Sequence, residues 1–214
     1  MADFRSELVE AAGKELTRFG GRKETDSAVR PLLMEYWMEG AGRSSNTAKN
    51  EIANRTAWSA AFVSFVVKRA LAASGSVAEF EFSASHSVYA GAAIRNLLEQ
   101  KPFPGFYEIA PTGPGAGLPE IGDIIGSTRT TSLDDYADAV LAARTKQTYF
   151  SHFDVVTEVF PKEITVVGGN VSNSVTAKSV KLATDGFLPV RPFKFDSAGA
   201  VLSGPYLCMI KYRE

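Results

Sequence analysis

The sequence predicts a domain of the α+β class, with N-terminal helices packed on an antiparallel sheet. Apolar residues recur at helical spacing through the N-terminal half, and alternating, strand-like segments follow in the C-terminal half. Helices followed by a strand meander indicate α+β rather than a parallel α/β sheet. We expect one domain over 1–214, made of a helical extension (1–50), a core (50–185) and a C-terminal strand segment (186–214).

Length and composition support a domain with a sizeable core. The 214 residues are 45% hydrophobic and 22% charged, as in ordinary globular proteins. The net charge of −1 gives no basic surface for nucleic acid, and no apolar run approaches the roughly 20 residues of a membrane-spanning helix. Charges are scattered through residues 1–7, so we expect no signal peptide there.

Two helices are predicted first. Apolar residues recur every three or four positions over residues 3–19, and two glycines then close the segment. A second helix is predicted over residues 26–39, where Asp26 can cap the first turn. Residues 40–50 are small and polar, which predicts a loop.

A third helix, over residues 57–73, is apolar nearly all round, which predicts that it is central. Thr56 is expected to cap it, and a fourth helix is predicted over residues 84–99. Residues 101–119 hold five prolines and four glycines, which predicts a long ordered loop.

The remaining elements form the sheet and one insert. Residues 121–125 read as a short strand, and residues 132–145 as a helix capped by Ser132, with Asp135 completing a capping box. Four further strands are predicted over residues 152–160, 163–168, 174–182 and 205–213. Cys208, the one cysteine, lies in the last of them and is expected to be a buried structural thiol.

The most informative stretch is residues 56–65 (TAWSAAFVSF), at the start of the central helix. Ser59 would occupy its first turn, where free backbone N–H groups and the helix dipole can stabilise a developing oxyanion. This placement makes Ser59 a candidate nucleophile. The competing interpretation is a small polar residue of the kind favoured near helix starts.

His152 begins the alternating strand, and neutral imidazole is a natural proton acceptor for a hydroxyl. Asn170 ends the next strand, which the antiparallel hairpin would bring beside His152. Its side-chain carbonyl could then hold the imidazole tautomer. Asp154, two residues beyond His152 on the same face, is the alternative orienting group. The competing interpretations are a strand-edge histidine without a task and an Asn in a tight turn.

Three further residues are candidates for lining a substrate cleft: Trp58, His86 and Tyr89. No Cys/His cluster has zinc-ligand spacing. Asp134, Asp135 and Asp138 lie where acidic residues favour a first helical turn without any metal. We therefore predict no metal and no cofactor.

Four motifs together resemble CHAP-type and NlpC-type amidohydrolases and peptidases. Residues 58–63 (WSAAFV) are similar to the Trp-Cys-Ala-Ala-Phe-Val signature of those enzymes, and residues 119–125 (PEIGDII) to their Pro-x-x-Gly-Asp-hydrophobic strand. Residues 151–156 (SHFDVV) resemble their Gly-His-Val-Gly-Ile-Val strand, and residues 168–175 (GGNVSNSV) their Gly-Gly-Asn-Gln-Ser-Asn-x-Val segment. The resemblance covers about residues 50–185. The chain also resembles a bacterial family of uncharacterised proteins, domain of unknown function 2272, in which serine likewise occupies the Trp-Ser-Ala-Ala-Phe motif.

The resemblance implies a papain-like fold with a cleft between the central helix and the sheet. It implies a bacterial hydrolase of peptide or amide bonds, with peptidoglycan as the default substrate. Ser59 would be the nucleophile, His152 the base, and Asn170 or Asp154 the orienting group. The protein would be cytoplasmic or exported by a non-classical route. A secreted toxin or phage lysis factor fits that expectation, with a secretion-system or immunity protein as partner.

Two alternatives accompany this reading. A cysteine thiol has a pKa near 8.5 and ionises in part at neutral pH, whereas a serine hydroxyl needs a base that acts during attack. The chain could therefore be an inactive papain-like module that binds cell-wall peptide or a protein partner. The third reading is that Ser59 replaces an original cysteine by engineering.

Overall fold

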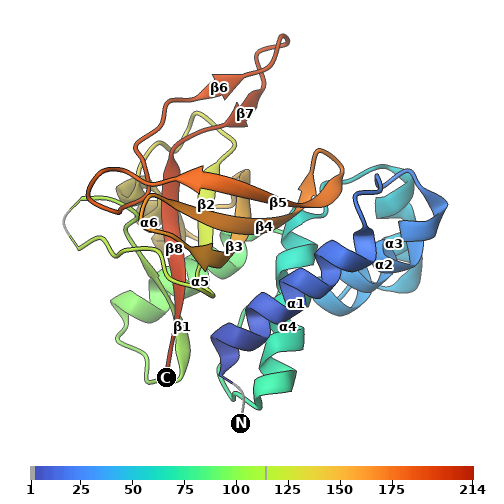
Figure 1. Cartoon of the computed structure of the whole chain (residues 1–214), viewed down its shortest axis with the longest axis horizontal. Helices are drawn as coiled ribbons and strands as arrows, with labels where there is room; N and C mark the ends of the chain where they lie inside the picture. Colours follow the sequence, from blue (N-terminus) through green and yellow to red (C-terminus); the bar gives the residue numbers. More distant parts are fainter. Residues whose placement is uncertain (1–2, 114) are drawn as a thin grey trace.

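A six-stranded antiparallel sheet with helices packed against it forms the body of the protein, which confirms the α+β class (Figure 1). The computed structural model describes residues 3–113 and 115–214. The predicted helical extension from residue 1 and the predicted loop over 101–119 therefore each include residues outside the described part. No helix in the described ranges is both long and apolar enough to cross a membrane.

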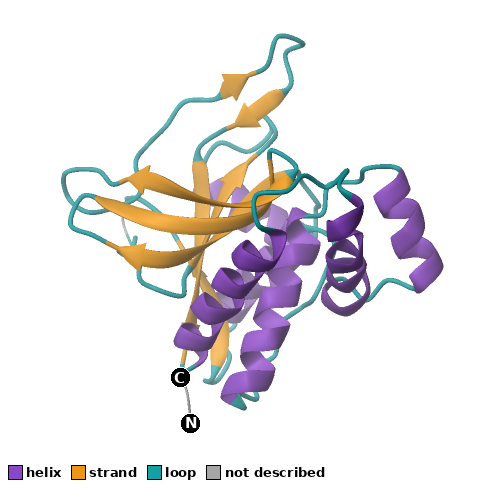
Figure 2. Ribbon diagram, turned by 45° about the vertical axis from the view of Figure 1, so that its right-hand side comes forward, coloured by secondary structure: helices purple, strands orange, loops and turns teal. Residues whose placement is uncertain are grey.

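Helices occupy the N-terminal half and one insert between strands, and Figure 2 shows them packed beside the strands. The predictions over 3–19, 57–73 and 84–99 are confirmed, and the segment over 26–39 is divided among three short helical forms. The helices are α1 (Phe4–Phe19), the 3-10 turn η1 (Ser27–Val29), α2 (Arg30–Glu35), the π-helical turn η2 (Tyr36–Gly40), α3 (Ser45–Ala53), α4 (Ser59–Ser74), α5 (His86–Leu98) and α6 (Tyr136–Thr145).

Three local predictions in the helices are wrong. Residues 40–50 include most of α3, because Ser44 caps the segment by accepting from the backbone N–H of Thr47, and no Gly or Pro follows to break it. Thr56 does not cap α4, whose N-cap residue is Trp58 with no side-chain bond. Asp135, not Ser132, caps α6.

The sheet has the order β1-β8-β2-β3-β4-β5, so the last strand of the chain lies between β1 and β2. The strands predicted over 152–160, 163–168, 174–182 and 205–213 are confirmed. The six strands are β1 (Gly105–Ile109), β2 (Ile124–Thr128), β3 (Ser151–Val159), β4 (Glu163–Val171), β5 (Ser174–Lys181) and β8 (Tyr206–Arg213), and a separate ribbon pairs β6 (Lys194–Phe195) with β7 (Val201–Ser203).

Two strand predictions need correction. β1 lies within the segment predicted as loop, because its backbone pairs with β8 over all five residues despite the flanking prolines and glycines. β2 begins at Ile124 rather than at residue 121, because Gly122 adopts φ 81° in a turn before it. Cys208 is buried in β8, as predicted, and burial raises the pKa of its thiol.

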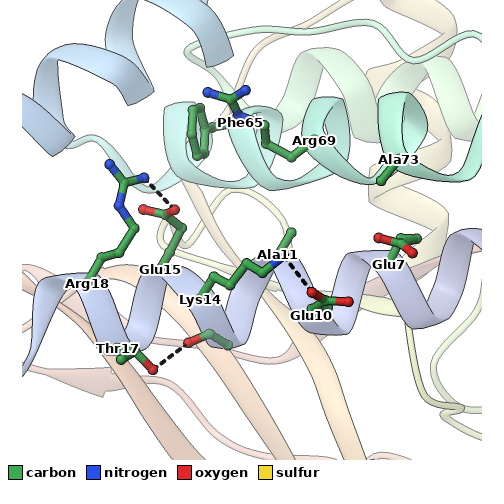
Figure 3. Close-up of a pocket in the computed structure, with 11 residues that line it drawn as sticks. Glu7, Glu10, Ala11, Lys14, Glu15, Thr17, Arg18, Phe65, Arg69 and Ala73 are labelled. Atoms are coloured by element: carbon green, nitrogen blue, oxygen red, sulfur yellow. Dashed lines mark hydrogen bonds and ion pairs between the residues drawn. The ribbon is translucent and has the colours of Figure 1, made fainter.

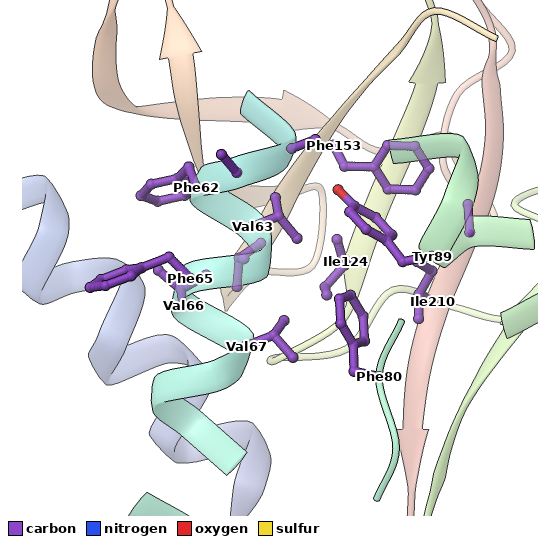
Figure 4. Close-up of a cluster of buried hydrophobic side chains, with 14 of the residues drawn as sticks. Phe62, Val63, Phe65, Val66, Val67, Phe80, Tyr89, Ile124, Phe153 and Ile210 are labelled. Atoms are coloured by element: carbon purple, nitrogen blue, oxygen red, sulfur yellow. The ribbon is translucent and has the colours of Figure 1, made fainter. Parts of the chain in front are cut away.

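Helix α4 is the central element, as its all-round apolar pattern predicts. Figure 4 shows Phe65 pointing toward α1, while Val63 and Val67 point toward the sheet and α5. All three side chains are buried in one continuous core. The N-terminal end of α4 is therefore held between α1 and the sheet, which positions Ser59.

The two glycines of the residue 168–175 motif permit close packing at this point. A methyl group on Gly169 would lie 2.5 Å from the side chain of Phe62, so only glycine lets β4 approach α4 this closely. A methyl group on Gly168 would lie 2.0 Å from Oδ1 of Asp154. The pair thus brings helix and strand together and leaves room for a buried carboxylate.

Substitution of Gly169 tests this packing. Gly169→Ala should lower the free energy of unfolding by about 1–3 kcal/mol, the usual cost of overpacking a core. Gly13→Ala is the matched control, because nothing lies within 4 Å of a methyl group there and its position inside α1 favours alanine. Urea unfolding of both variants checks the prediction, and a Gly169→Ala protein as stable as wild type would contradict it.

Candidate active site

Three buried polar side chains form a hydrogen-bonded line where the N-terminus of α4 meets β3. Oγ of Ser59 lies 2.9 Å from Nδ1 of His152, and Nε2 of His152 lies 3.0 Å from Oδ1 of Asp154. Ser59 is the first residue of α4, and the other two are alternate residues on β3. The exposed fractions are 7%, 6% and 5%, so the line is shielded from bulk water.

The charge of Asp154 sets the direction of these hydrogen bonds. Burial alone would raise the pKa of this carboxyl, but the adjacent His152 and Lys178 hold it well below its usual range. An ionised carboxylate can only accept, so Nε2 of His152 carries the proton and donates it. In the neutral ring Nδ1 is then a bare acceptor that faces the hydroxyl of Ser59.

Lys178 completes the environment of the carboxylate. Its Nζ lies 2.8 Å from Oδ2 of Asp154, on the oxygen that His152 leaves free. Lys178 belongs to β5, two strands away from β3. Its pairing with Val166 across β4 puts it on the face that Asp154 shares, and the sequence interpretation missed it.

Free backbone donors lie at the start of α4. The first donor with a partner is Phe62, whose N–H bonds to the carbonyl of Trp58. Within the described chain, the N–H groups of Ser59, Ala60 and Ala61 have no acceptor. These donors and the helix dipole favour negative charge beside the Ser59 hydroxyl.

Asn170, the other candidate orienting group, has a different position from the one predicted. In the described chain its side chain makes no hydrogen bond with the ring, whose Nε2 is bonded to Asp154. The regular β4–β5 pairing is interrupted between Gly168 and Val171, and Asn170 adopts φ 59° in that irregularity. Of the two orienting groups that the sequence left open, the geometry therefore favours Asp154.

Trp58, expected to line a substrate cleft, packs in the core, and the cavity of about 200 Å³ that it borders is not lined by Ser59 or His152. Trp58 is 1% exposed, stacks between Phe19 and Tyr36, and donates from Nε1 to a carboxylate oxygen of Glu24 at 2.8 Å. These contacts fix the backbone directly before Ser59.

His86 and Tyr89 form the inner wall of the site rather than an open binding surface. His86 stacks on Phe153, with ring centroids 5.1 Å apart, and its centroid lies 6.0 Å from that of His152. The hydroxyl of Tyr89 is hydrogen-bonded to its Nδ1. Burial, together with the nearby His152, lowers the pKa of His86, so this ring stays neutral beside the candidate base.

A separate groove lies between α1 and α4 (Figure 3). It measures about 900 Å³, and none of the three hydrogen-bonded residues lines it. Its charged residues include the ion pairs Lys14–Glu10 and Arg18–Glu15.

The acidic cluster at the start of α6, Asp134, Asp135 and Asp138, is used for capping, since Asp135 accepts from the N–H of Asp138 at 2.9 Å.

The buried carboxylate makes stability depend on pH in a defined direction. Because the pKa of Asp154 is lower in the folded than in the unfolded protein, its stabilising effect is complete above about pH 4 and decreases as the pH falls further. Wild type should unfold with a higher free energy than Asp154→Asn at pH 5, and this difference should shrink by about pH 3. Urea titrations of both proteins measure it, and a difference that grows on acidification would contradict the ionised state.

Comparisons with known proteins place the chain in a family. The model for "Uncharacterized protein conserved in bacteria (DUF2272)" matches residues 30–198, which include α4, β3 and all three residues of the hydrogen-bonded line. Searches of curated proteins and of solved structures gave no match. The match covers well over half of the sequence. The chain belongs to the bacterial family DUF2272.

Proposed function

We propose that this protein is a serine hydrolase of peptide or amide bonds, with Ser59 as nucleophile, His152 as general base and Asp154 as the group that orients the imidazole. The observation that carries the proposal is the continuous line from Oγ of Ser59 to the carboxylate of Asp154. A nucleophile bonded to a base, with the base held by a third group, is the arrangement that activates a hydroxyl.

The reaction follows from the positions of the protons. Oγ of Ser59 attacks the carbonyl carbon while its proton moves to Nδ1 of His152. Negative charge develops on the carbonyl oxygen, where the free N–H groups at the start of α4 would stabilise it. His152 returns the proton to the departing amine as the C–N bond breaks. Water, deprotonated by the same nitrogen, then cleaves the acyl ester and regenerates Ser59.

The substrate class rests on resemblance. The motif order and the meeting of a helix N-terminus with a histidine-bearing strand support a papain-like arrangement of the CHAP and NlpC kind. In that arrangement the natural substrates are peptide or amide bonds of bacterial peptidoglycan. A toxin or lysis factor that degrades the cell wall is a biological role that fits this substrate.

Covalent labelling tests the nucleophile. Wild type should react with a fluorophosphonate probe, and both Ser59→Ala and His152→Ala should abolish the labelling, because an unassisted hydroxyl is a poor nucleophile. Ser197→Ala is the matched control, since Ser197 is exposed and makes no side-chain hydrogen bond. Thermal melting verifies that each variant is folded. Labelling that persists in Ser59→Ala would show that another residue reacts.

The near-complete burial of the site favours one second candidate. Ser59 and His152 are each less than a tenth exposed, so an extended substrate needs the surrounding loops to open. A papain-like module that binds cell-wall peptide or a protein partner without catalysis would tolerate this. Wild type that neither labels nor cleaves purified peptidoglycan, yet sediments with it, would support the binding module.

A further inference from the structure

Besides Lys178, a second cation, Arg129, lies near the hydrogen-bonded line of Ser59, His152 and Asp154. It makes none of the hydrogen bonds in that line. β2 pairs with β3 so that Ser127 is opposite His152 and Thr128 is opposite Ser151. The pairing continues by one residue, with the backbone N–H of Arg129 donating to the carbonyl of Phe150 at 2.8 Å. Arg129 therefore follows directly on the strand next to the candidate base.

Arg129 is the first residue after β2, and the alternation of that strand, extended by one residue, puts Arg129 on the face of His152 and Asp154. Residues opposite each other in a pair share a face, and so do residues two apart on one strand. Ser127 shares its face with His152, and Arg129 is two residues beyond Ser127. That spacing is about 7 Å along the strand, and neighbouring strands lie about 5 Å apart. The guanidinium can therefore reach the surroundings of the His152 ring.

In the described ranges, no hydrogen bond and no ion pair involves the side chain of Arg129, and its Nε is buried without an acceptor. Asp154, the nearby carboxylate, already accepts from His152 on one oxygen and contacts Lys178 on the other. Burial lowers the pKa of Arg129; the negative charge of Asp154 opposes this effect, and the like charge of Arg191 adds to it. A partly buried cation of this kind is stabilised by an added anion.

Arg191 differs from Arg129 in this respect. Its Nε donates to the carbonyl of Gly204 at 2.6 Å, and its guanidinium lies over the ring of Tyr206 at 4.1 Å. Arg191 is thus fixed by the protein and adds positive charge to the same region. The two terminal nitrogens of Arg129 keep their donors, and their planar arrangement matches the two oxygens of a carboxylate.

We propose that Arg129 binds a carboxylate of the substrate close to the bond that Ser59 attacks. This inference rests on the proposed function and narrows its substrate class to peptides that carry a free carboxylate beside the scissile bond. An acidic group held there would pair with Arg129, in a region where Arg191 adds positive charge, and would leave the contacts of Asp154 with His152 and Lys178 in place. Uncharged peptides would bind without this contact and therefore more weakly.

Binding without turnover tests the proposal. The Ser59→Ala protein, labelled with ¹⁵N, is titrated with N-acetyl-Ala-Ala and with its C-terminal amide, which differ only in the charged group. Chemical-shift changes in β2 and β3 give the two affinities. A hydrogen-bonded charge pair contributes about 1.5–3 kcal/mol, so the acid should bind at least about tenfold more tightly than the amide.

Variants assign the preference to one side chain. Adding Arg129→Gln should reduce the acid-to-amide ratio to about one with little change for the amide. Arg129→Lys keeps the charge but loses the fork, and should give an intermediate ratio. Arg144→Gln, at an exposed position on α6, is the matched control and should keep the full ratio.

The outcomes separate this inference from the hydrolase proposal. Equal binding of acid and amide before Arg129 is changed, no saturable binding of the acid, or a preference that survives Arg129→Gln, would overturn the carboxylate site. If the protein prefers the acid but wild type does not react with fluorophosphonate, the carboxylate site stands and only the proposed catalysis is contradicted. Thermal melting of each variant confirms that lost binding does not reflect unfolding.

Discussion

The hydrogen bond between Nε2 of His152 and the carboxylate of Asp154 is the interaction on which the candidate site depends. It is 3.0 Å long and buried, and it selects the imidazole tautomer whose free nitrogen faces Ser59. Burying a carboxylate is unfavourable unless it is paired, and here His152 and Lys178 are its partners. Lys178 contacts the second oxygen, and the missing side chain of Gly168 leaves the space that the carboxylate fills.

Packing around α4 holds Ser59 next to the strand that carries His152 and Asp154. Trp58, packed between aromatic rings and bonded to Glu24, fixes the chain immediately before Ser59. Gly169 lets β4 press against Phe62 of α4, so the helix start and the sheet meet closely. This alignment matters for the proposed nucleophile, because a serine hydroxyl is activated only while the base is in contact. Arg129 adds positive charge without taking part in that alignment.

Much of this arrangement could be predicted from the sequence. The apolar pattern of α4 and the alternation of β3 predicted the helix and the strand, and the resemblance of the motifs singled out Ser59 and His152 on them. The two-residue spacing put Asp154 on the face of His152. Asn170 could not be excluded, because its irregular backbone depends on where the β4–β5 pairing breaks. Lys178 and Arg129 become visible only from strand register, which sequence periodicity does not specify. β1 and α3 were not predicted because their local composition favours loops. Pairing with the distant strand β8 forms β1, and the cap provided by Ser44 begins α3.

The tautomer of His152 is the most direct test of this account. The chain has two histidines, so the ¹⁵N spectrum of protein labelled only at histidine is simple, and His86→Gln identifies the signals of His152. At a pH where the ring is neutral, the account predicts a protonated Nε2 and an unprotonated Nδ1 that accepts from Ser59. Replacing Ser59 by alanine should then shift the Nδ1 signal. A ring protonated at Nδ1 would donate to the serine oxygen, could not act as its base, and would contradict the account.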